Sequence, residues 1–60
     1  MEYFLVHLYY YISQPHDYRL VLRLVKADGP VEAQSKAELY GKTNAPEGHI
    51  LDRVEVIATL

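Results

Sequence analysis

Two stretches of the chain alternate between strongly apolar positions and mixed positions with the period of a β-strand. From Tyr3 to Ser13 every even position is large and apolar, whereas the odd positions carry aromatic, aliphatic and polar residues. Between Asp17 and Ala27 a tyrosine and three leucines at even positions alternate with arginines and valines at odd ones. Successive side chains of a strand point to opposite faces of a sheet. The pattern therefore predicts two strands, each with one strongly apolar face.

The connection between these strands bears on how they pair. It contains Gln14-Pro15-His16, and proline fixes φ at about −65°, so it cannot supply the positive φ that opens a two-residue hairpin turn. We therefore expect a loop of three or more residues. Keeping both apolar faces on one side requires an even register, such as Ile12 opposite Tyr18 and Tyr10 opposite Leu20, because a slip of one residue turns a strand over.

A helix is predicted directly after the second strand. Asp28-Gly29-Pro30 places proline at the first helical position and leaves the aspartate or the glycine as N-cap. The helix should run to about Tyr40 and end at Gly41. At about 100° per residue, Ala33, Ala37 and Tyr40 share one side. We expect this side to pack on the sheet, with the small alanines allowing a close approach.

The segment from Lys42 to Gly48 is expected to be a loop, and alternation from His49 onward predicts a third strand. A right-handed crossover through the helix places that strand parallel to the second, so the first strand lies in the centre, antiparallel to both. Residues 1–60 are thus expected to form one α+β domain, a ββαβ fold with sheet order 2-1-3 and one helix on one face, like half of a ferredoxin-like fold. The side chains expected beneath the helix are Phe4, Val6, Leu8, Tyr10, Leu20, Leu22, Leu24, Val54 and Val56.

The opposite face of this sheet has no cover in the predicted fold. Its mixture of aromatic, aliphatic and arginine side chains is typical of the centre of a protein interface, and its apolar area is large enough to expect a partner. Val25, Glu55 and Thr59 fall on the same side. The predicted partner-binding residues are Tyr3, Leu5, His7, Tyr9, Tyr11, Arg19, Val21, Arg23, Arg53 and Ile57.

Three other interpretations of this face stay open. Tyr9 and Tyr11 lying across from Arg19 and Arg23 would form exposed cation–π pairs without a binding role. A homodimer would use the sheet face, or the C-terminal edge strand in a continuous two-fold sheet. Tyrosines flanked by arginines also suit stacking of single-stranded bases, although the net charge of −2 opposes nucleic-acid binding.

Composition narrows the chemistry further. The chain has no cysteine, which excludes disulfides and thiolate metal sites, and it contains no catalytic motif. His16 and Asp17 at the turn would approach His49 and Asp52, a nitrogen and oxygen ligand set that suits zinc, but loop histidines near an acid are usually solvated. We predict no cofactor, no metal and no enzymatic activity. The opening run lacks the basic region of a signal peptide and is too short and polar to span a bilayer, so we expect a complete cytoplasmic protein without a membrane partner.

The size and element order resemble those of the small stand-alone αβ proteins that phages and mobile elements encode, including anti-CRISPR and host-takeover inhibitors. The resemblance covers the whole chain and involves no residue motif, so it transfers no functional residue. It implies a non-enzymatic protein that covers a working surface of a host complex.

Overall fold

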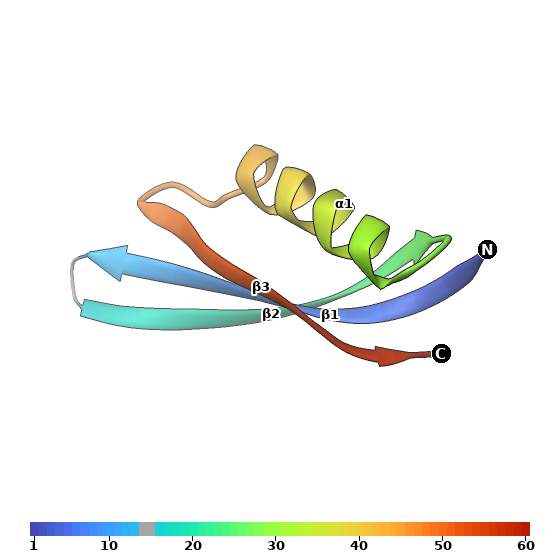
Figure 1. Cartoon of the computed structure of the whole chain (residues 1–60). Coiled ribbons are helices and arrows are strands. Elements are labelled where there is room, and N and C mark those ends of the chain that lie inside the picture. Colours follow the sequence, from blue (N-terminus) through green and yellow to red (C-terminus); the bar gives the residue numbers. More distant parts are fainter. Residues whose placement is uncertain (14–15) are drawn as a thin grey trace.

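The computed structural model describes residues 1–13 and 16–60 and confirms the predicted fold class (Figure 1). Strand β1 spans Glu2–Ser13, β2 spans His16–Ala27, helix α1 spans Pro30–Thr43 and β3 spans His49–Thr59. The three strands form one sheet in the order β2-β1-β3, and β1 is antiparallel to both neighbours. Helix α1 lies on one side of this sheet, and no element of the described residues lies on the other side (Figure 1).

The core lies between α1 and the central strand. Phe4, Val6, Leu8 and Tyr10 point toward the helix from β1 and are almost fully buried. This confirms that the even positions of the first strand face the helix. Small residues of the helix, Ala33, Ala37 and Gly41, complete the contact, and Val54 and Val56 of β3 pack against it half-buried. Together with Ala27 of β2, these are the side chains that form the core among the described residues, so the core is thin.

The helix begins where it was predicted but runs past its predicted end. Gly29 is the N-cap, and Pro30 occupies the first turn. The expectation that Gly41 ends the helix is wrong, because Gly41 lies inside it and is buried against the sheet. A Cβ atom at this position would lie 2.9 Å from Leu51 Cδ2. A side chain here would have to displace the end of Leu51, so the glycine favours close approach of helix and sheet rather than a positive φ.

The helix ends instead at Asn44, the C-cap residue. Both the backbone N–H and the side-chain amide of Asn44 donate to the Tyr40 carbonyl oxygen, at 2.9 and 3.0 Å. Gly48, with φ of 78°, takes up a left-handed conformation just before β3, and the left-handed region favours glycine. These features set the direction in which the chain enters β3.

The register between β1 and β2 differs from the predicted one. Ser13 pairs with His16, and the same register places Tyr10 opposite Arg19 rather than Leu20 and Ile12 opposite Asp17 rather than Tyr18. His16, which was assigned to the loop, belongs to β2; Gln14 and Pro15 lie outside the described residues. Relative to the prediction, β2 is turned over. The odd positions of β2 face α1, and the leucines at positions 20, 22 and 24 face the uncovered side.

The small residues of α1 give the physical reason for this register. A helix that approaches the sheet through alanine and glycine leaves little space beneath it, and the large side chains of β1 already fill that space. Ala27 is fully buried at the end of β2, whereas the adjacent Lys26 lies opposite Tyr3 on the uncovered side. The predicted register would place Lys26 beneath the first turn of the helix, where its charge would be desolvated.

Strand β3 departs from regular pairing at two points. Its register against β1 shifts between Leu5 and Val6 and again between Tyr9 and Tyr10. Such irregularities bend a strand and interrupt the row of backbone groups on its outer edge. The sheet is twisted, so β3 runs obliquely to the other strands in the view of Figure 1, and both bulges lie on this edge strand.

The molecule is elongated and thin, with principal extents of 39 × 18 × 13 Å. Its radius of gyration is 11.7 Å, compared with about 10.4 Å expected for a compact domain of this length. In the part of the chain that the structure describes, no helix is long and apolar enough to cross a membrane. The shape follows from a long sheet that has a helix on one side only.

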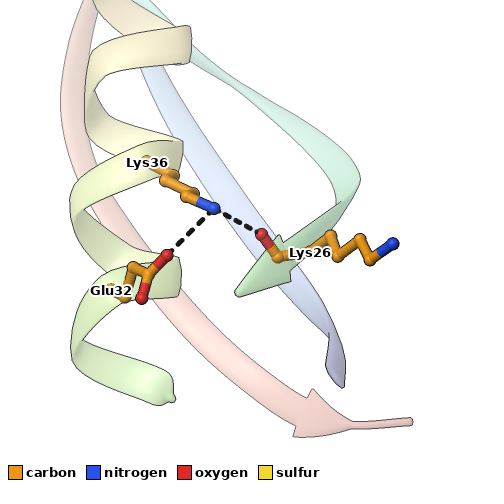
Figure 2. A network of polar contacts seen from close by, with 3 residues as sticks. All are labelled: Lys26, Glu32 and Lys36. Atoms are coloured by element: carbon orange, nitrogen blue, oxygen red, sulfur yellow. Dashed lines mark hydrogen bonds and ion pairs between the residues drawn. The ribbon is translucent and has the colours of Figure 1, made fainter. Parts of the chain in front are cut away.

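A polar network fixes the first turns of α1 to the end of β2 (Figure 2). Lys36 Nζ donates to the Lys26 carbonyl oxygen at 2.8 Å and lies 3.0 Å from Glu32 Oε1. The Lys36 hydrogen bond is the main reason that the pKa of the Glu32 carboxyl is lowered. Because all three groups are exposed to solvent, the network orients the helix more than it stabilises the fold.

The lowered pKa of Glu32 leads to a pH-dependent prediction. A carboxyl whose pKa is lower in the folded state stabilises the fold above its unfolded pKa, and this contribution is lost as pH falls through the folded pKa. E32Q should therefore melt slightly below the wild type at neutral pH and match it in acid. Melting curves followed by circular dichroism across the acid range test this. In a K36Q background the pH-dependent effect of E32Q should become smaller, leaving the part of the lowered pKa that comes from the Asp28 backbone, and an undiminished effect would contradict the assignment to Lys36.

Candidate functional site

The uncovered side of the sheet, called the open face here, is the candidate functional site. Each strand contributes alternate side chains to it, and cross-strand pairing shows which residues share this side. From β1 come Tyr3, Leu5, His7, Tyr9 and Tyr11; from β2, Tyr18, Leu20, Leu22, Leu24 and Lys26; from β3, Ile50, Arg53, Glu55 and Ala58.

The leucines of β2 form the most apolar part of the open face. Leu20, Leu22 and Leu24 are 53%, 54% and 59% exposed, although leucine is among the residues most often buried in folded proteins. Tyr18 and Ile50 are exposed to a similar degree at one end of the face. Single exposed apolar residues are common, but a contiguous patch of this kind marks an interaction surface.

Aromatic side chains and one arginine form the middle of the open face. Tyr9 and His7 are neighbours on β1, with their rings edge to face and their centroids 5.8 Å apart. Arg53 of β3 stacks on Tyr9, and its guanidinium carbon lies 4.3 Å from the centroid of the Tyr9 ring. This cation–π contact holds the arginine flat against the sheet. The middle of the face is therefore ordered before any partner arrives.

A second aromatic cluster lies near the hairpin end. The Tyr11 hydroxyl makes a hydrogen bond with His16 Nδ1, and the ring of its cross-strand partner Tyr18 lies 5.5 Å away between centroids. These contacts fix the outward direction of Tyr11. The three consecutive tyrosines thus divide between the two faces, as the alternation predicts, with Tyr10 buried and its neighbours on the open face.

The structure divides the predicted partner-binding residues into two groups. Arg19, Val21 and Arg23 lie on the helix side of β2, so their placement on the open face is wrong, as is that of Val25. Arg23 stacks on Tyr40 of α1, 4.3 Å from its ring centroid, and not on a tyrosine of β1. Ile57 falls at a register shift without a partner on β1 and is partly exposed. The residues placed on the open face as predicted are Tyr3, Leu5, His7, Tyr9, Tyr11 and Arg53.

The position of Arg19 and Arg23 on the opposite face from Tyr9 and Tyr11 also bears on the other interpretations of the open face. The predicted cation–π pairs of Tyr9 and Tyr11 with Arg19 and Arg23 are wrong, and the cation that Tyr9 does contact is Arg53. A base-stacking surface flanked by the arginines of β2 loses its geometric basis, because those arginines lie on the opposite face. The open face is more apolar and less basic than predicted.

Sequence reasoning missed Tyr18, Leu20, Leu22, Leu24 and Ile50 as members of the open face. The signal that places four of them there is the end of β2, where a lysine precedes an alanine just before the helix. An alanine fits beneath the first turn of a closely packed helix, whereas a lysine does not. A register that places Ala27 rather than Lys26 beneath the helix turns the leucines of β2 outward.

A groove runs along the helix side of β2, because α1 does not cover this edge strand completely. It has a volume of about 290 Å³ and is lined by apolar groups of Leu8, Val25 and Ala37 and by the polar ends of Lys36 and Tyr40. Arg23 lies at its rim, stacked on Tyr40. The groove is smaller than a hollow of about 450 Å³ on the open face, which is lined by Tyr9, Tyr18, Asp52 and Arg53.

The residues considered as metal ligands do not form a site. Within residues 1–13 and 16–60, no group of three or more histidine, aspartate or glutamate side chains could hold a metal ion. His16 contacts Tyr11, while Asp17 accepts a hydrogen bond from the Tyr18 backbone N–H. The His49 ring lies edge-on to Tyr10, 6.1 Å between centroids.

Comparison with known proteins identified no relative of this chain. No protein-family model matches the chain, and searches of curated proteins and of solved structures found no match. The geometry and chemistry of the open face are therefore the basis for assigning a function to this chain.

Proposed function

We propose that this chain is a non-enzymatic protein-binding module that works through its open face. The observation that carries the proposal is the row of three leucines on β2, each more than half exposed. Apolar surface left in water costs about 25 cal/mol per Å², and a partner that covers the row removes this cost. An apolar row of this length suits a protein surface better than a small molecule, which usually binds in an enclosed site.

The polar groups of the face support the same function. Tyrosine and arginine dominate the energetically important centres of protein interfaces, and here Tyr9 and Arg53 are already stacked on each other. Side chains held in place before binding lose less conformational entropy when they bind. The face therefore combines apolar area with ordered anchors.

A phage-encoded inhibitor of a host complex is one class of protein that would bind its target through such a face. An inhibitor of this kind would act in the cytoplasm. This finer assignment has its support only in the size and element order of the chain. The alternative is a homodimeric accessory protein, and the thin core favours it, because a 60-residue chain without disulfides gains stability from association.

A photo-crosslinking experiment tests the proposed function. A photoreactive amino acid at the position of Leu22 should give protein adducts in the cells that contain this chain, because Leu22 is the central residue of the exposed leucine row on β2. The same amino acid at Val31, which is 81% exposed on α1, provides the matched control and should give far fewer adducts. Mass spectrometry of the adducts identifies the partner.

Two results would count against the function. Adducts formed equally at Leu22 and Val31 would show that contact is non-specific, and an absence of adducts at Leu22 would show that the open face stays uncovered. L22K provides an independent check: it should reduce association while the circular dichroism spectrum stays native, because substitutions at exposed positions usually change stability by about 0.5 kcal/mol or less.

A further inference from the structure

The open face has an internal symmetry that suggests its occupant. Val21, Leu8 and Val54 lie side by side across the three strands, and their side chains point away from the open face. On one side of this level the open face carries the row Leu22–His7–Glu55. On the other side it carries the row Leu20–Tyr9–Arg53. Each row runs from leucine through an aromatic ring to a charge, and the two charges have opposite sign.

A second copy can lie face to face on this sheet with its two-fold axis in one of two main directions. An axis along the strands places the leucines of β2 over the charged strand β3 of the partner, so Arg53 and Glu55 would be desolvated against apolar side chains at a high cost. An axis across the strands places each strand over its own copy in the opposite direction. This second arrangement brings one row of each copy over the other row of its partner.

We propose that the open face binds a second copy of this chain, with the two-fold axis crossing the strands at the level of Val21, Leu8 and Val54. Leu22 then lies over Leu20 of the partner subunit, His7 over Tyr9 of the partner subunit, and Glu55 over Arg53 of the partner subunit. Apolar, aromatic and oppositely charged groups meet in pairs, which is the self-complementarity that a two-fold interface requires. The inference rests on the proposed function, because it names the occupant of the same face.

The rows farther from the axis fit the same arrangement. Leu24, Leu5 and Ala58 form one outer row, and Tyr11 lies in the other between Tyr18 and Ile50. The two-fold axis places the aliphatic row over the aromatic one, apart from the displacement that the bulges of β3 introduce. Sheets that pack face to face cross at about 30°, which preserves the pairing best near the axis. No charge of these outer rows is buried against an apolar group.

The exposed area suits a dimer interface. Six large side chains on the open face are each half exposed or more: Tyr3, Tyr18, Leu20, Leu22, Leu24 and Ile50. At roughly 200 Å² per large side chain, their exposed parts come to on the order of 600 Å², and the half-buried residues of β1 add to this. A stable interface buries about 800 Å² per partner. The dimer would be a four-layer structure with the helices outside and a second core between the sheets.

Association through the sheet edges would cover less of the exposed apolar surface than association through the open face. Pairing of two edge strands would lengthen the sheet and leave the leucine row in water. The outer edge of β3 is also interrupted by two register shifts, and bulges of this kind oppose edge-to-edge pairing. Covering the face therefore accounts for more of the exposed apolar surface than extending the sheet.

Charge reversal tests the arrangement directly. In the proposed dimer R53E places two acids together and E55R places two bases together, so each variant alone should raise the dimer dissociation constant roughly 100-fold or more, as expected for like charges at an interface. An equimolar mixture of the two restores both pairs and should dimerise within about tenfold of the wild type. Sedimentation velocity at micromolar concentrations measures all three samples, with circular dichroism as the check of folding. V31K, on the exposed side of α1, is the control and should leave dimerisation unchanged.

The possible failures separate the two proposals. A wild-type chain that is a folded monomer at micromolar concentrations would overturn the second copy as occupant, and Leu22 adducts to a different protein would then leave the proposed function standing. A dimer that R53E, E55R and L22K all leave intact would overturn the second copy as occupant of the open face, since its interface would lie elsewhere, and the Leu22 adducts would then decide the proposed function separately. A mixture of R53E and E55R that stays monomeric while both variants are folded would overturn the arrangement of rows.

Discussion

Replacing Tyr10 with alanine should destabilise the fold by about 3–5 kcal/mol, the range typical of large aromatic side chains truncated in a core. Tyr10 is almost fully buried, and its hydroxyl donates a hydrogen bond to the Gly41 carbonyl oxygen at 2.9 Å. A 60-residue domain has a total stability of about 3–9 kcal/mol, so the Y10A chain should be largely unfolded in mild urea. Urea titration followed by circular dichroism at one protein concentration measures the effect.

A further variant, Y10F, separates the contributions of the ring and the hydroxyl at this position. Y10F keeps the ring and removes the hydroxyl, so it should cost about 1 kcal/mol, the usual net value of one hydrogen bond. Burial is the main reason that the pKa of Tyr10 is raised. A raised pKa means that the stabilising contribution is complete below the unfolded pKa and is lost as pH rises through the folded one. Y10F should therefore unfold less steeply in alkali than the wild type.

Tyr11 supplies the control for the tyrosine cluster. It is the neighbour of Tyr10 but lies on the open face, so Y11A should weaken association and cost the monomer much less than Y10A. Equal losses of stability at the two positions, at concentrations where the chain is monomeric, would contradict the division of the tyrosines between the two faces.

Replacing Gly41 with leucine should destabilise the fold by about 3 kcal/mol, at the upper end of what overpacking costs. A Cβ atom there already lies 2.9 Å from one Leu51 methyl carbon and 3.2 Å from the other, and 3.4 Å from the Tyr10 hydroxyl. A leucine side chain has no space in this contact, so the last turns of α1 must move away from the sheet. Thermal unfolding followed by circular dichroism gives the loss.

Gly29 is the matched control for Gly41. A Cβ atom at Gly29 has no atom within 4 Å, and its backbone is extended, so G29A should cost only about 1 kcal/mol or less, the loss expected when alanine replaces a better N-cap residue. A leucine at position 41 that is tolerated as well as an alanine at position 29 would show that the helix does not lie close to β3. The pair of variants thus measures the close approach itself rather than the loss of a flexible residue.

The thin core and the open face are two consequences of one packing arrangement. Half of the residues are hydrophobic, yet the fully buried side chains larger than alanine are those of Phe4, Val6, Leu8 and Tyr10. A helix with alanine and glycine on its buried side contributes little volume to a core. The remaining apolar residues stay at the surface, and the largest group of them gathers on the open face. A second copy would turn this group into a core.

Strand β2 shows most clearly where the prediction from sequence agrees with the structure and where it differs. The alternation of Leu20, Leu22 and Leu24 with Arg19 and Arg23 predicted a strand with a strongly apolar side, and the strand is present. The side that faces the helix was assigned wrongly, because the more hydrophobic side was expected to be the buried one. That rule holds where the covering layer has room for large side chains, and α1 does not provide such room.

The helix end shows the same division between local and tertiary information. Glycine after a run of helical residues usually marks a helix end, and Gly41 was assigned this role from its neighbours in sequence. The contact that determines its role comes from Leu51 of β3 and Tyr10 of β1, which are distant along the chain. No local pattern contains that contact.

The sequence by itself determined the elements, their order, the central place of β1 and the division of the three tyrosines between its two faces. These features depend on the alternation along single strands and on the proline and glycine between them, which are local properties. Only the tertiary structure decided which side of β2 faces α1, where α1 ends and which residues form the open face. Both sides of β2 are compatible with a strand, so the choice depends on the small distance between helix and sheet and on placing Ala27, rather than Lys26, beneath the first turn of α1.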